Sequence, residues 1–318
     1  MTVEEFIEEW HDNKDYIIAH TSGSTGKPKE VRLLKSDMRC SARATNQFFN
    51  IGKNSRLMLC LSPDYIAGKM MIVRALEANA ELLVESPSNH PLSDYDGSRI
   101  DLIAVVPSQA LFLANHVSLL NNVSSMIVGG GEIAPELWEK LAVLPYRIYS
   151  TYGMTETCSH VALAKISREK EPYKALPGVE FAVDDRDCLI IKAPKYSFGK
   201  LVTNDIVRLL SPLSFKWIGR YDNVINTGGI KVFPEEVEQK IAHIIPTRFY
   251  IGSRKSEKWG NEVVLFMECD SLSDYQKDII MADISKILSP IERPKDIIFL
   301  EKFQETSSGK IKRDKQVK

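Results

Sequence analysis

The sequence predicts an α/β protein, with a large layered α/β domain that includes a small β subdomain and with a separate α+β domain after it. Up to about residue 219, apolar runs such as YIIA, RLMLCL and DLIAVV alternate with helix-length segments such as 36–49 and 66–77. This alternation is typical of helices layered on a largely parallel sheet. Residues 178–218 differ, because strand-like runs follow one another there with little helix between them. They predict the small β subdomain.

The C-terminal part of the chain predicts the compact α+β domain. FPEEVEQKIAHII reads as a helix, because Pro234 opens it and two glutamates occupy its first turn, where the helix dipole favours acidic side chains. Two strand-like runs, a helix over 274–288 and a last strand-like run follow. We therefore expect an N-terminal domain of residues 1–221 and a C-terminal domain of residues 222–318.

Composition excludes several classes of function. The 318 residues carry 41 Lys and Arg against 42 Asp and Glu, so the net charge of −1 leaves no electrostatic footprint for nucleic acid. No apolar run approaches the ~20 residues of a membrane span, and the acidic start of the chain is unlike a signal peptide. Five scattered cysteines without a CxxC pair favour neither disulfides nor a zinc site. We expect a protein of the reducing cytoplasm.

The segment HTSGSTGKPKEV, residues 20–31, predicts a polyphosphate-binding loop. It follows the strand-like run YIIA and is dense in hydroxyl groups, glycine and lysine. Glycines allow backbone N–H groups to turn toward an anion, and Ser and Thr add further donors. The loop is not a Walker A motif, because Pro28 follows Lys27 where that motif has Ser or Thr. The competing interpretation is a flexible surface turn.

Two later apolar runs end in polar motifs, GGGEIAP at 129–135 and STYGMTET at 150–157. The carboxyl ends of strands form the usual ligand crevice of an α/β sheet. There Tyr152 could stack on a purine, Thr155 could contact a phosphate, and Glu156 offers a hard oxygen ligand suited to Mg²⁺. Singly, each residue type is more often structural, so the prediction depends on their combination.

Three further features lie closer to the C-terminus. Asp205 follows a strand-like run and could accept hydrogen bonds from both hydroxyls of a ribose. Arg220 and Asp222 form a charged elbow between the predicted domains, ahead of the turn at Gly228–Gly229, where a plain linker and hairpin is the alternative interpretation. Lys310 follows a glycine on a loop that could enter a cleft, although a lysine in such a place is more often exposed and without a role.

Taken in order, TSGSTGKPK, YGMTE, GRYDNVINTGGIKVFPEEVE and SSGKIKR resemble the motifs of the adenylate-forming superfamily of acyl-CoA synthetases, luciferases and peptide-synthetase adenylation domains. The resemblance runs from His20 almost to the C-terminus. It implies that hydroxyl and lysine side chains of the first motif contact the phosphates of ATP: Thr21, Ser22, Ser24, Thr25 and Lys29. It implies that the adenosine is held by glycines, an aromatic ring, a carboxylate and an arginine: Gly130, Gly131, Tyr152, Asp205 and Arg220.

The same resemblance implies catalytic roles, with Thr155 on the α-phosphate, Glu156 on Mg²⁺ and Lys310 as the catalytic lysine of a mobile C-terminal domain. A substrate carboxylate is already ionised near neutral pH and needs no general base, so Lys310 and Mg²⁺ would stabilise the charge on the phosphate. In family members the domain then rotates about the position of Asp222, and Gly228–Gly229 lines the tunnel for the second substrate, CoA.

The chain is most similar to the compact o-succinylbenzoate–CoA ligases of menaquinone biosynthesis. Its phosphate loop begins near residue 20, whereas typical relatives carry another N-terminal subdomain, and YGMTETCSHVAL is similar to that subfamily. Arg74 falls where those enzymes place a substrate-facing arginine, whose fork suits the second carboxylate of a dicarboxylate. Lys69 is a second candidate, and Tyr65 stands where many relatives have a histidine at the acid pocket. The competing interpretation of Arg74 is a surface salt bridge.

Several alternatives stay open. The small-molecule carboxylate could be another aryl or short acyl acid, or the acceptor could be a carrier-protein thiol. A non-catalytic nucleotide-binding relative is disfavoured, because Lys310, Glu156, Asp205 and the phosphate loop are all retained. The wall left by the missing subdomain could be covered by another subunit of a homo-oligomer, or its surface could have become polar.

Overall fold

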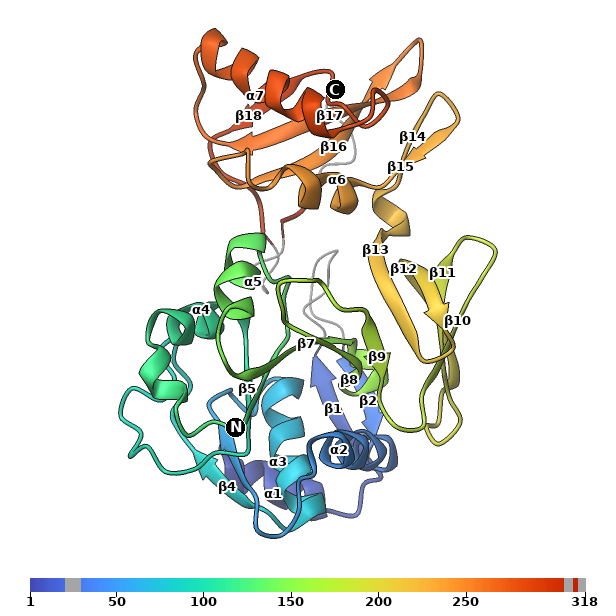
Figure 1. Ribbon diagram of the computed structural model, residues 1–318. Helices are drawn as coiled ribbons and strands as arrows, with labels where there is room; N and C mark the ends of the chain where they lie inside the picture. The colour runs from blue at the N-terminus through green and yellow to red at the C-terminus, as the bar shows by residue number, and fades with distance from the viewer. Residues whose placement is uncertain (21–29, 306–310, 314–318) are drawn as a thin grey trace. The chain divides into compact units, whose positions relative to one another are not determined.

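The computed structural model of the chain describes residues 1–20, 30–305 and 311–313 (Figure 1). Eleven strands of this part form one large sheet: β3 (Arg56–Leu59), β4 (Glu81–Val84), β5 (Leu102–Val105), β6 (Ser125–Val128), β7 (Arg147–Gly153), β8 (His160–Lys165), β9 (Tyr173–Ala175), β10 (Glu180–Val183), β11 (Cys188–Ala193), β12 (Gly199–Ser211) and β13 (Ser214–Arg220). Their spatial order is β10-β11-β12-β13-β9-β8-β7-β6-β5-β3-β4. The predicted α/β class with a large sheet is confirmed.

The sheet is parallel in one part and antiparallel in another. The strands β4, β3, β5, β6 and β7 pair in parallel, whereas β8 and β9 continue the sheet with antiparallel pairs. Every residue of β5 and of β6 is buried, as expected of parallel strands that are covered on both faces. The predicted parallel sheet therefore holds for β3 to β7, whereas the pairs β7–β8, β8–β9 and β9–β13 are antiparallel.

Helices cover both faces of the parallel part of the sheet. They are α1 (Val3–His11), α2 (Lys35–Phe49), α3 (Ile66–Ala78), α4 (Pro107–Asn115) and α5 (Pro135–Ala142). The short 3₁₀ turns η1 (Val117–Leu120), η2 (Thr155–Thr157) and η3 (Tyr221–Asn223) lie in connections between other elements. Alternate strand residues enter two cores: Leu57 and Leu102 pack with residues of α1, α2 and α3, whereas Met58 and Ile103 pack with residues of α4 and α5. This period of two produces a layered α/β/α arrangement.

A separate two-stranded sheet brackets the predicted phosphate loop. In it β1 (Tyr16–His20) pairs antiparallel with β2 (Glu30–Leu34), and the last register pair is His20 with Glu30. The two ends of the loop therefore lie opposite each other. Strand β2 also contacts η2, the turn that carries Thr155 and Glu156.

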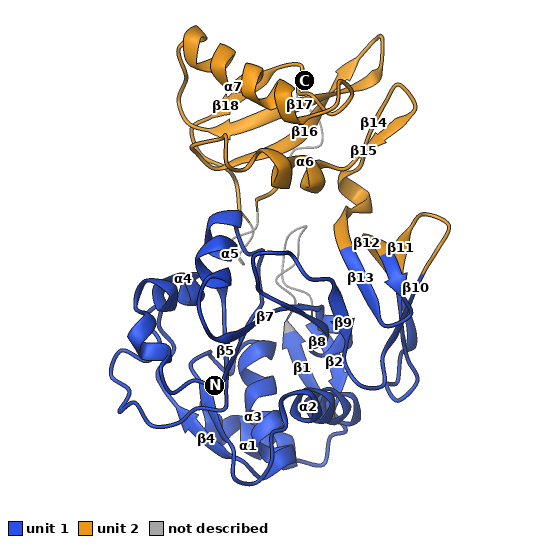
Figure 2. Cartoon of the chain, in the orientation of Figure 1, with its two compact units in different colours: residues 1–182, 190–201, 209–216 blue, residues 183–189, 202–208, 217–318 orange. Residues whose placement is uncertain are grey.

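The chain divides into two compact units, coloured separately in Figure 2: residues 1–182, 190–201 and 209–216 form the first, and residues 183–189, 202–208 and 217–318 form the second. The elements that lie wholly in the second unit, besides η3, are β14 (Ile225–Thr227), β15 (Ile230–Val232), α6 (Pro234–Ile241), β16 (Phe249–Ser256), β17 (Gly260–Glu268), α7 (Asp274–Ile287) and β18 (Ile297–Leu300). Strand β17 pairs antiparallel with β16 and parallel with β18, and Val237, Ile251 and Ile284 lie in their shared core. The domain boundary at residue 222 and the mobility of the C-terminal domain stay predictions.

All five cysteines are free thiols, and they differ in burial. Cys60, Cys158 and Cys188 are buried, whereas Cys40 in the first unit and Cys269 in the second are partly exposed. Burial raises the pKa of the Cys60 and Cys158 thiols to about 12.

Among the described residues, no helix combines the length and apolar character that a membrane crossing requires.

Candidate functional site

The glycine motif and the YGMTE motif lie side by side at one edge of the sheet. Strands β6 and β7 are parallel neighbours, with Val128 opposite Ser150, so the residues that follow them emerge together. A Cβ at Gly129 would lie 2.2 Å from the hydroxyl oxygen of Thr151, and Gly130 adopts φ +80°. Neither position tolerates a side chain easily, so packing against Thr151 requires glycine at the first and the backbone conformation favours it at the second.

Tyr152 is half-buried in an aromatic cluster. Its ring lies 5.0 Å from that of Phe215, edge-on, and 5.7 Å from that of Tyr173. Phe181 completes the cluster with a T-shaped contact to Phe215 at 4.9 Å. This packing fixes the Tyr152 ring near the end of β7, while its contact with a purine stays a prediction.

The turn after β7 holds Thr155 and Glu156 at the end of a tight bend. A Cβ at Gly153 would lie 2.3 Å from the carbonyl oxygen of Ser159, so only glycine fits this close approach. The buried hydroxyl of Thr157, to which the sequence analysis gave no role, accepts a hydrogen bond from the N–H of Met154 at 3.0 Å. Glu156 is exposed.

Six predicted site residues lie outside the described part of the chain. They are the phosphate-loop residues Thr21, Ser22, Ser24, Thr25 and Lys29, together with the lysine of the C-terminal motif, Lys310. The contact of β2 with η2 brings the chain directly after the loop to the turn of Thr155 and Glu156. The roles of the six residues stay predictions.

Asp205 and Arg220, the two predicted ribose contacts, lie together in the second unit. The Asp205 carboxylate accepts hydrogen bonds from Arg220 Nη1 at 3.3 Å and from Trp217 Nε1 at 3.4 Å. The other guanidinium nitrogen of Arg220 donates to Asp222 at 3.2 Å. Asp205 is buried, with 9% of its side chain exposed. Trp217, which shares β13 with Arg220, was not among the site residues predicted from the sequence.

Gly228 and Gly229 form the tight turn between β14 and β15. Their φ values are +58° and +82°, and a Cβ at Gly228 would lie 2.8 Å from the ring of Trp259. The N–H of Gly228 donates to the carbonyl of Trp259 at 2.9 Å. The geometry requires glycine at Gly228, while a role in a CoA tunnel stays a prediction.

Arg74 is fully buried on α3, so its interpretation as a surface salt bridge is wrong. Only 2% of the residue is exposed. Its Nη2 donates to the hydroxyl of Ser159 at 2.6 Å and its Nη1 approaches the sulfur of Met71 at 3.2 Å. No described carboxylate forms an ion pair with Arg74, and its Nε has no hydrogen-bond partner among the described residues. Burial lowers the pKa of Arg74 to about 10.

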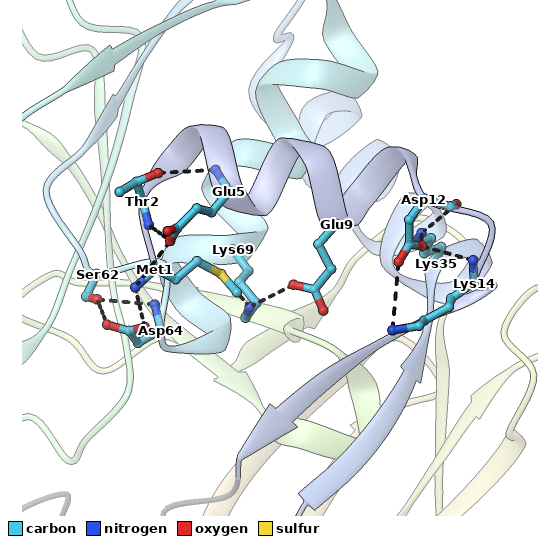
Figure 3. A network of polar contacts seen from close by, with 10 residues as sticks. All are labelled: Met1, Thr2, Glu5, Glu9, Asp12, Lys14, Lys35, Ser62, Asp64 and Lys69. Carbon is cyan, nitrogen blue, oxygen red and sulfur yellow. Dashed lines mark hydrogen bonds and ion pairs between the residues drawn. The ribbon is translucent and has the colours of Figure 1, made fainter.

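Lys69, the second candidate for acid binding, contacts side chains of α1 (Figure 3). Its ammonium group lies 3.7 Å from Glu9 and 4.8 Å from the centre of the Phe6 ring. Burial lowers the pKa of Lys69, and Glu9 offsets part of this effect. Positions five apart on a helix differ in direction by about 140°, so Lys69 and Arg74 leave α3 on different sides. These contacts do not favour the predicted role of Lys69, and Tyr65, at the N-terminal end of α3, is 70% exposed.

Arg313, the last residue of the SSGKIKR motif, forms an ion pair within the second unit. Its two terminal nitrogens donate to the two carboxylate oxygens of Glu238 at 2.7 and 2.8 Å, and Glu238 also accepts from the N–H of Ile251 at 2.7 Å. Burial raises the pKa of Glu238 to about 7, although Arg313 lowers it. Because this pKa lies above the ordinary value, the contribution of Glu238 to stability is complete below about pH 4.5 and is lost as the pH rises through about 7.

Replacing Arg313 by leucine is therefore expected to destabilise the second unit more at pH 8 than at pH 5. At the higher pH the variant keeps a buried carboxylate without its partner, a change that costs about 3–5 kcal/mol for fully buried pairs and less here, where 20% of the Arg313 side chain is exposed. Urea denaturation at both pH values measures the difference. The matched control is Arg248→Leu, since the ion pairs of this half-exposed arginine lie at the surface and are worth at most about 1 kcal/mol. Equal losses at the two pH values would contradict the prediction.

Comparison with known proteins decides the family. A family model described as AMP-binding enzyme matches residues 4–203, more than half of the chain. The chain belongs to this family. The sheet edge at Gly129–Gly131 and Tyr152–Glu156 lies within the matched residues.

Relatives within the AMP-binding family extend the similarity beyond the matched residues. The 2-succinylbenzoate–CoA ligase of Enterococcus faecalis is 26% identical, over 92% of this chain and 67% of the relative. That of Listeria monocytogenes is 26% identical, over 98% of this chain and 71% of the relative. The chain thus spans about two thirds of the length of these relatives.

Solved structures show the same fold. An acyl-CoA synthetase (AMP-forming)/AMP-acid ligase II-like protein from Dyadobacter fermentans is 33% identical, with 97% of this chain and 91% of that chain covered and a TM-score of 0.66. The o-succinylbenzoate CoA synthetase of Bacillus subtilis, solved with its acyl-adenylate intermediate, is 18% identical, with 93% and 67% covered and a TM-score of 0.78. The first relative is similar over nearly its whole length, which supports membership of the acyl-CoA ligase branch of the AMP-binding family.

Proposed function

We propose that the protein is a 2-succinylbenzoate–CoA ligase, which uses ATP and Mg²⁺ to form an acyl adenylate and then transfers the acyl group to CoA. The curated relatives with this activity support the proposal. Within the chain, the buried Arg74 supports it most directly.

A buried arginine without a carboxylate is costly unless an anion joins it. Removing an ionised group from water costs several kcal/mol, and a guanidinium does not lose its proton in the physiological range. Arg74 is 2% exposed and has a nitrogen without a hydrogen-bond partner among the described residues. A substrate with a second carboxylate would supply the missing charge, and 2-succinylbenzoate carries two carboxylates. One carboxylate would react while Arg74 holds the other.

Each of the two units carries residues that suit a part of the nucleotide. Asp205 has the acceptor oxygens for the ribose hydroxyls, and the hydrogen bond from Arg220 holds the carboxylate in place. The exposed carboxylate of Glu156 suits Mg²⁺, which commonly binds proteins through one or two carboxylates and completes its shell with water and phosphate oxygens. When bound, the metal would neutralise charge on the phosphates.

The reaction then needs little acid–base chemistry from the chain. The substrate carboxylate oxygen attacks the α-phosphorus, a C–O–P bond forms, and pyrophosphate leaves as the α–β bond breaks. Thr155 and Lys310 would stabilise the charge on the α-phosphate. In the second step the CoA sulfur attacks the acyl carbon and AMP leaves. The thiol proton is lost to solvent, since an ordinary thiol pKa of ~8.5 leaves some thiolate near neutral pH.

Carboxylate-dependent exchange of labelled pyrophosphate into ATP tests the proposal. We expect exchange with 2-succinylbenzoate, and a kcat/KM at least about 100-fold lower with benzoate, which cannot pair with Arg74 while its only carboxylate reacts. Exchange with a monocarboxylate of equal efficiency would favour another acyl acid. ATP binding in calorimetry without exchange across a broad acid panel would favour a non-catalytic relative.

A further inference from the structure

A series of hydrogen-bonded polar groups, all buried except the half-buried Ser159, leads away from Arg74. Arg74 Nη2 donates to Ser159 Oγ at 2.6 Å, Ser159 Oγ lies 3.3 Å from His160 Nδ1, and His160 Nε2 lies 3.2 Å from Thr45 Oγ1. The Thr45 hydroxyl donates to the carbonyl of Ser41 at 3.1 Å, one turn earlier in α2. The series thus connects α3, the start of β8 and α2.

The donor and acceptor roles along this series of hydrogen bonds can be assigned in only one way. Thr45 has a single hydroxyl proton, which it gives to the Ser41 carbonyl, so Thr45 Oγ1 must accept from His160 Nε2. A neutral imidazole carries one N–H. With the proton on Nε2, His160 Nδ1 is an acceptor and takes the hydroxyl proton of Ser159. The Ser159 oxygen is then left as a pure acceptor for Arg74.

The surroundings keep His160 neutral. The residue is buried, and burial lowers its pKa well below the ordinary value, with the positive charge of Arg74 adding to the effect. Both of its ring nitrogens have partners, so the simpler interpretation is a core histidine that only stabilises the fold.

We propose that His160 is a positioning residue for the acid substrate, because its Nε2–H tautomer directs the Ser159 hydroxyl away from Arg74 and so fixes the guanidinium with its Nε–H left for the remote carboxylate. The inference rests on the proposed dicarboxylate substrate. Without His160 the hydroxyl of Ser159 could rotate, and its proton would compete with the guanidinium for the same space. Arg74 would then hold the carboxylate in several orientations rather than one.

Two variants of His160 separate positioning from packing. His160→Leu removes the acceptor for Ser159, whereas His160→Asn places an amide oxygen near the position of Nδ1. For His160→Leu we expect the KM for 2-succinylbenzoate to rise about 10- to 100-fold, as for loss of a hydrogen bond to a charged group, with kcat and the KM for ATP nearly unchanged. His160→Asn should recover most of the affinity. An unchanged KM in His160→Leu, or equal effects in both variants, would overturn the proposal.

Thr45→Val tests the far end of the series in case His160→Leu does not fold. It removes the acceptor of His160 Nε2 with little change of volume, and the same selective rise in KM is expected. The matched control is Ser285→Ala, which removes a helix hydroxyl that donates to the Ala282 carbonyl in α7. A rise in KM in this control, or none in Thr45→Val, would count against the proposal.

The tautomer can be observed without any activity. The sequence has six histidines, so ¹⁵N-histidine labelling gives few signals, and the one lost in His160→Asn belongs to His160. We expect a neutral imidazole with a protonated Nε2 and a bare Nδ1 at neutral pH. A protonated Nδ1 would overturn the inference. Absence of carboxylate-dependent exchange would instead overturn the proposed function, so the two failures are distinguishable.

Discussion

Replacing Arg74 by leucine is expected to lower kcat/KM for 2-succinylbenzoate about 100- to 1000-fold, the effect of losing one partner of a buried charge pair. The kcat/KM for benzoate, and the affinity for ATP, should change little, because neither would use this guanidinium. Pyrophosphate exchange with the two acids gives the comparison. The kcat/KM of Arg74→Lys for 2-succinylbenzoate should fall between those of the unaltered protein and of Arg74→Leu. Lysine keeps the positive charge but lacks the fork that binds a carboxylate through two nitrogens.

The free energy of unfolding distinguishes a role of Arg74 in substrate binding from a role in supporting the core. Arg74 is buried and forms no ion pair with a described residue, so Arg74→Leu should leave the free energy of unfolding of the ligand-free protein unchanged or raise it. The matched control is Arg43→Leu on α2, whose side chain is 68% exposed and pairs with Glu77. An equal loss of activity with both acids, together with lower stability, would mean that Arg74 only supports the core.

Replacing Lys310 by alanine is expected to slow adenylate formation about 100- to 1000-fold while sparing the second step. Loss of a single group that stabilises developing charge has effects of this size. Transfer of the acyl group to CoA uses a preformed adenylate, from which the lysine is predicted to be withdrawn. Single-turnover measurements with ATP and acid, and separately with supplied acyl adenylate and CoA, measure the two rates.

Lys312→Ala is the control for this prediction. Lys312 is exposed two residues further on, and its backbone N–H, which donates to the carbonyl of Gln304 at 2.7 Å, is unaffected by the change. Both half-reactions should keep their rates. If Lys310→Ala slowed both steps equally, the assigned role of the lysine would be wrong.

Local sequence patterns predicted the elements well. The helical segments 36–49 and 66–77 correspond to α2 and α3, and the helix expected over 274–288 corresponds to α7. Strand-like runs followed by Gly or Ser placed the GGG and YGMTE motifs at strand ends, and the parallel pairing of β6 with β7 brings these ends together. Such features depend on neighbours in the chain, which a single sequence shows directly.

Local sequence patterns did not predict contacts between residues that are distant in the sequence. The burial of Arg74 arises because α3 packs between other elements, and its partner Ser159 lies 85 positions further along the chain. His160 is 115 positions from Thr45, so nothing in the local pattern marked it as part of a series of polar groups. Lys69, only five residues from Arg74, was the second candidate for the same role, and its salt bridge to Glu9 of α1 could not be predicted from the local pattern.

The distribution of thiols suits the chain for measurements of domain movement. The two partly exposed cysteines, Cys40 and Cys269, fall in different units, while Cys60, Cys158 and Cys188 are buried. Buried thiols of raised pKa react slowly with maleimides. A donor and an acceptor dye attached to the unaltered sequence would therefore sit on opposite sides of the predicted hinge, where energy transfer between them could follow each half of the catalytic cycle.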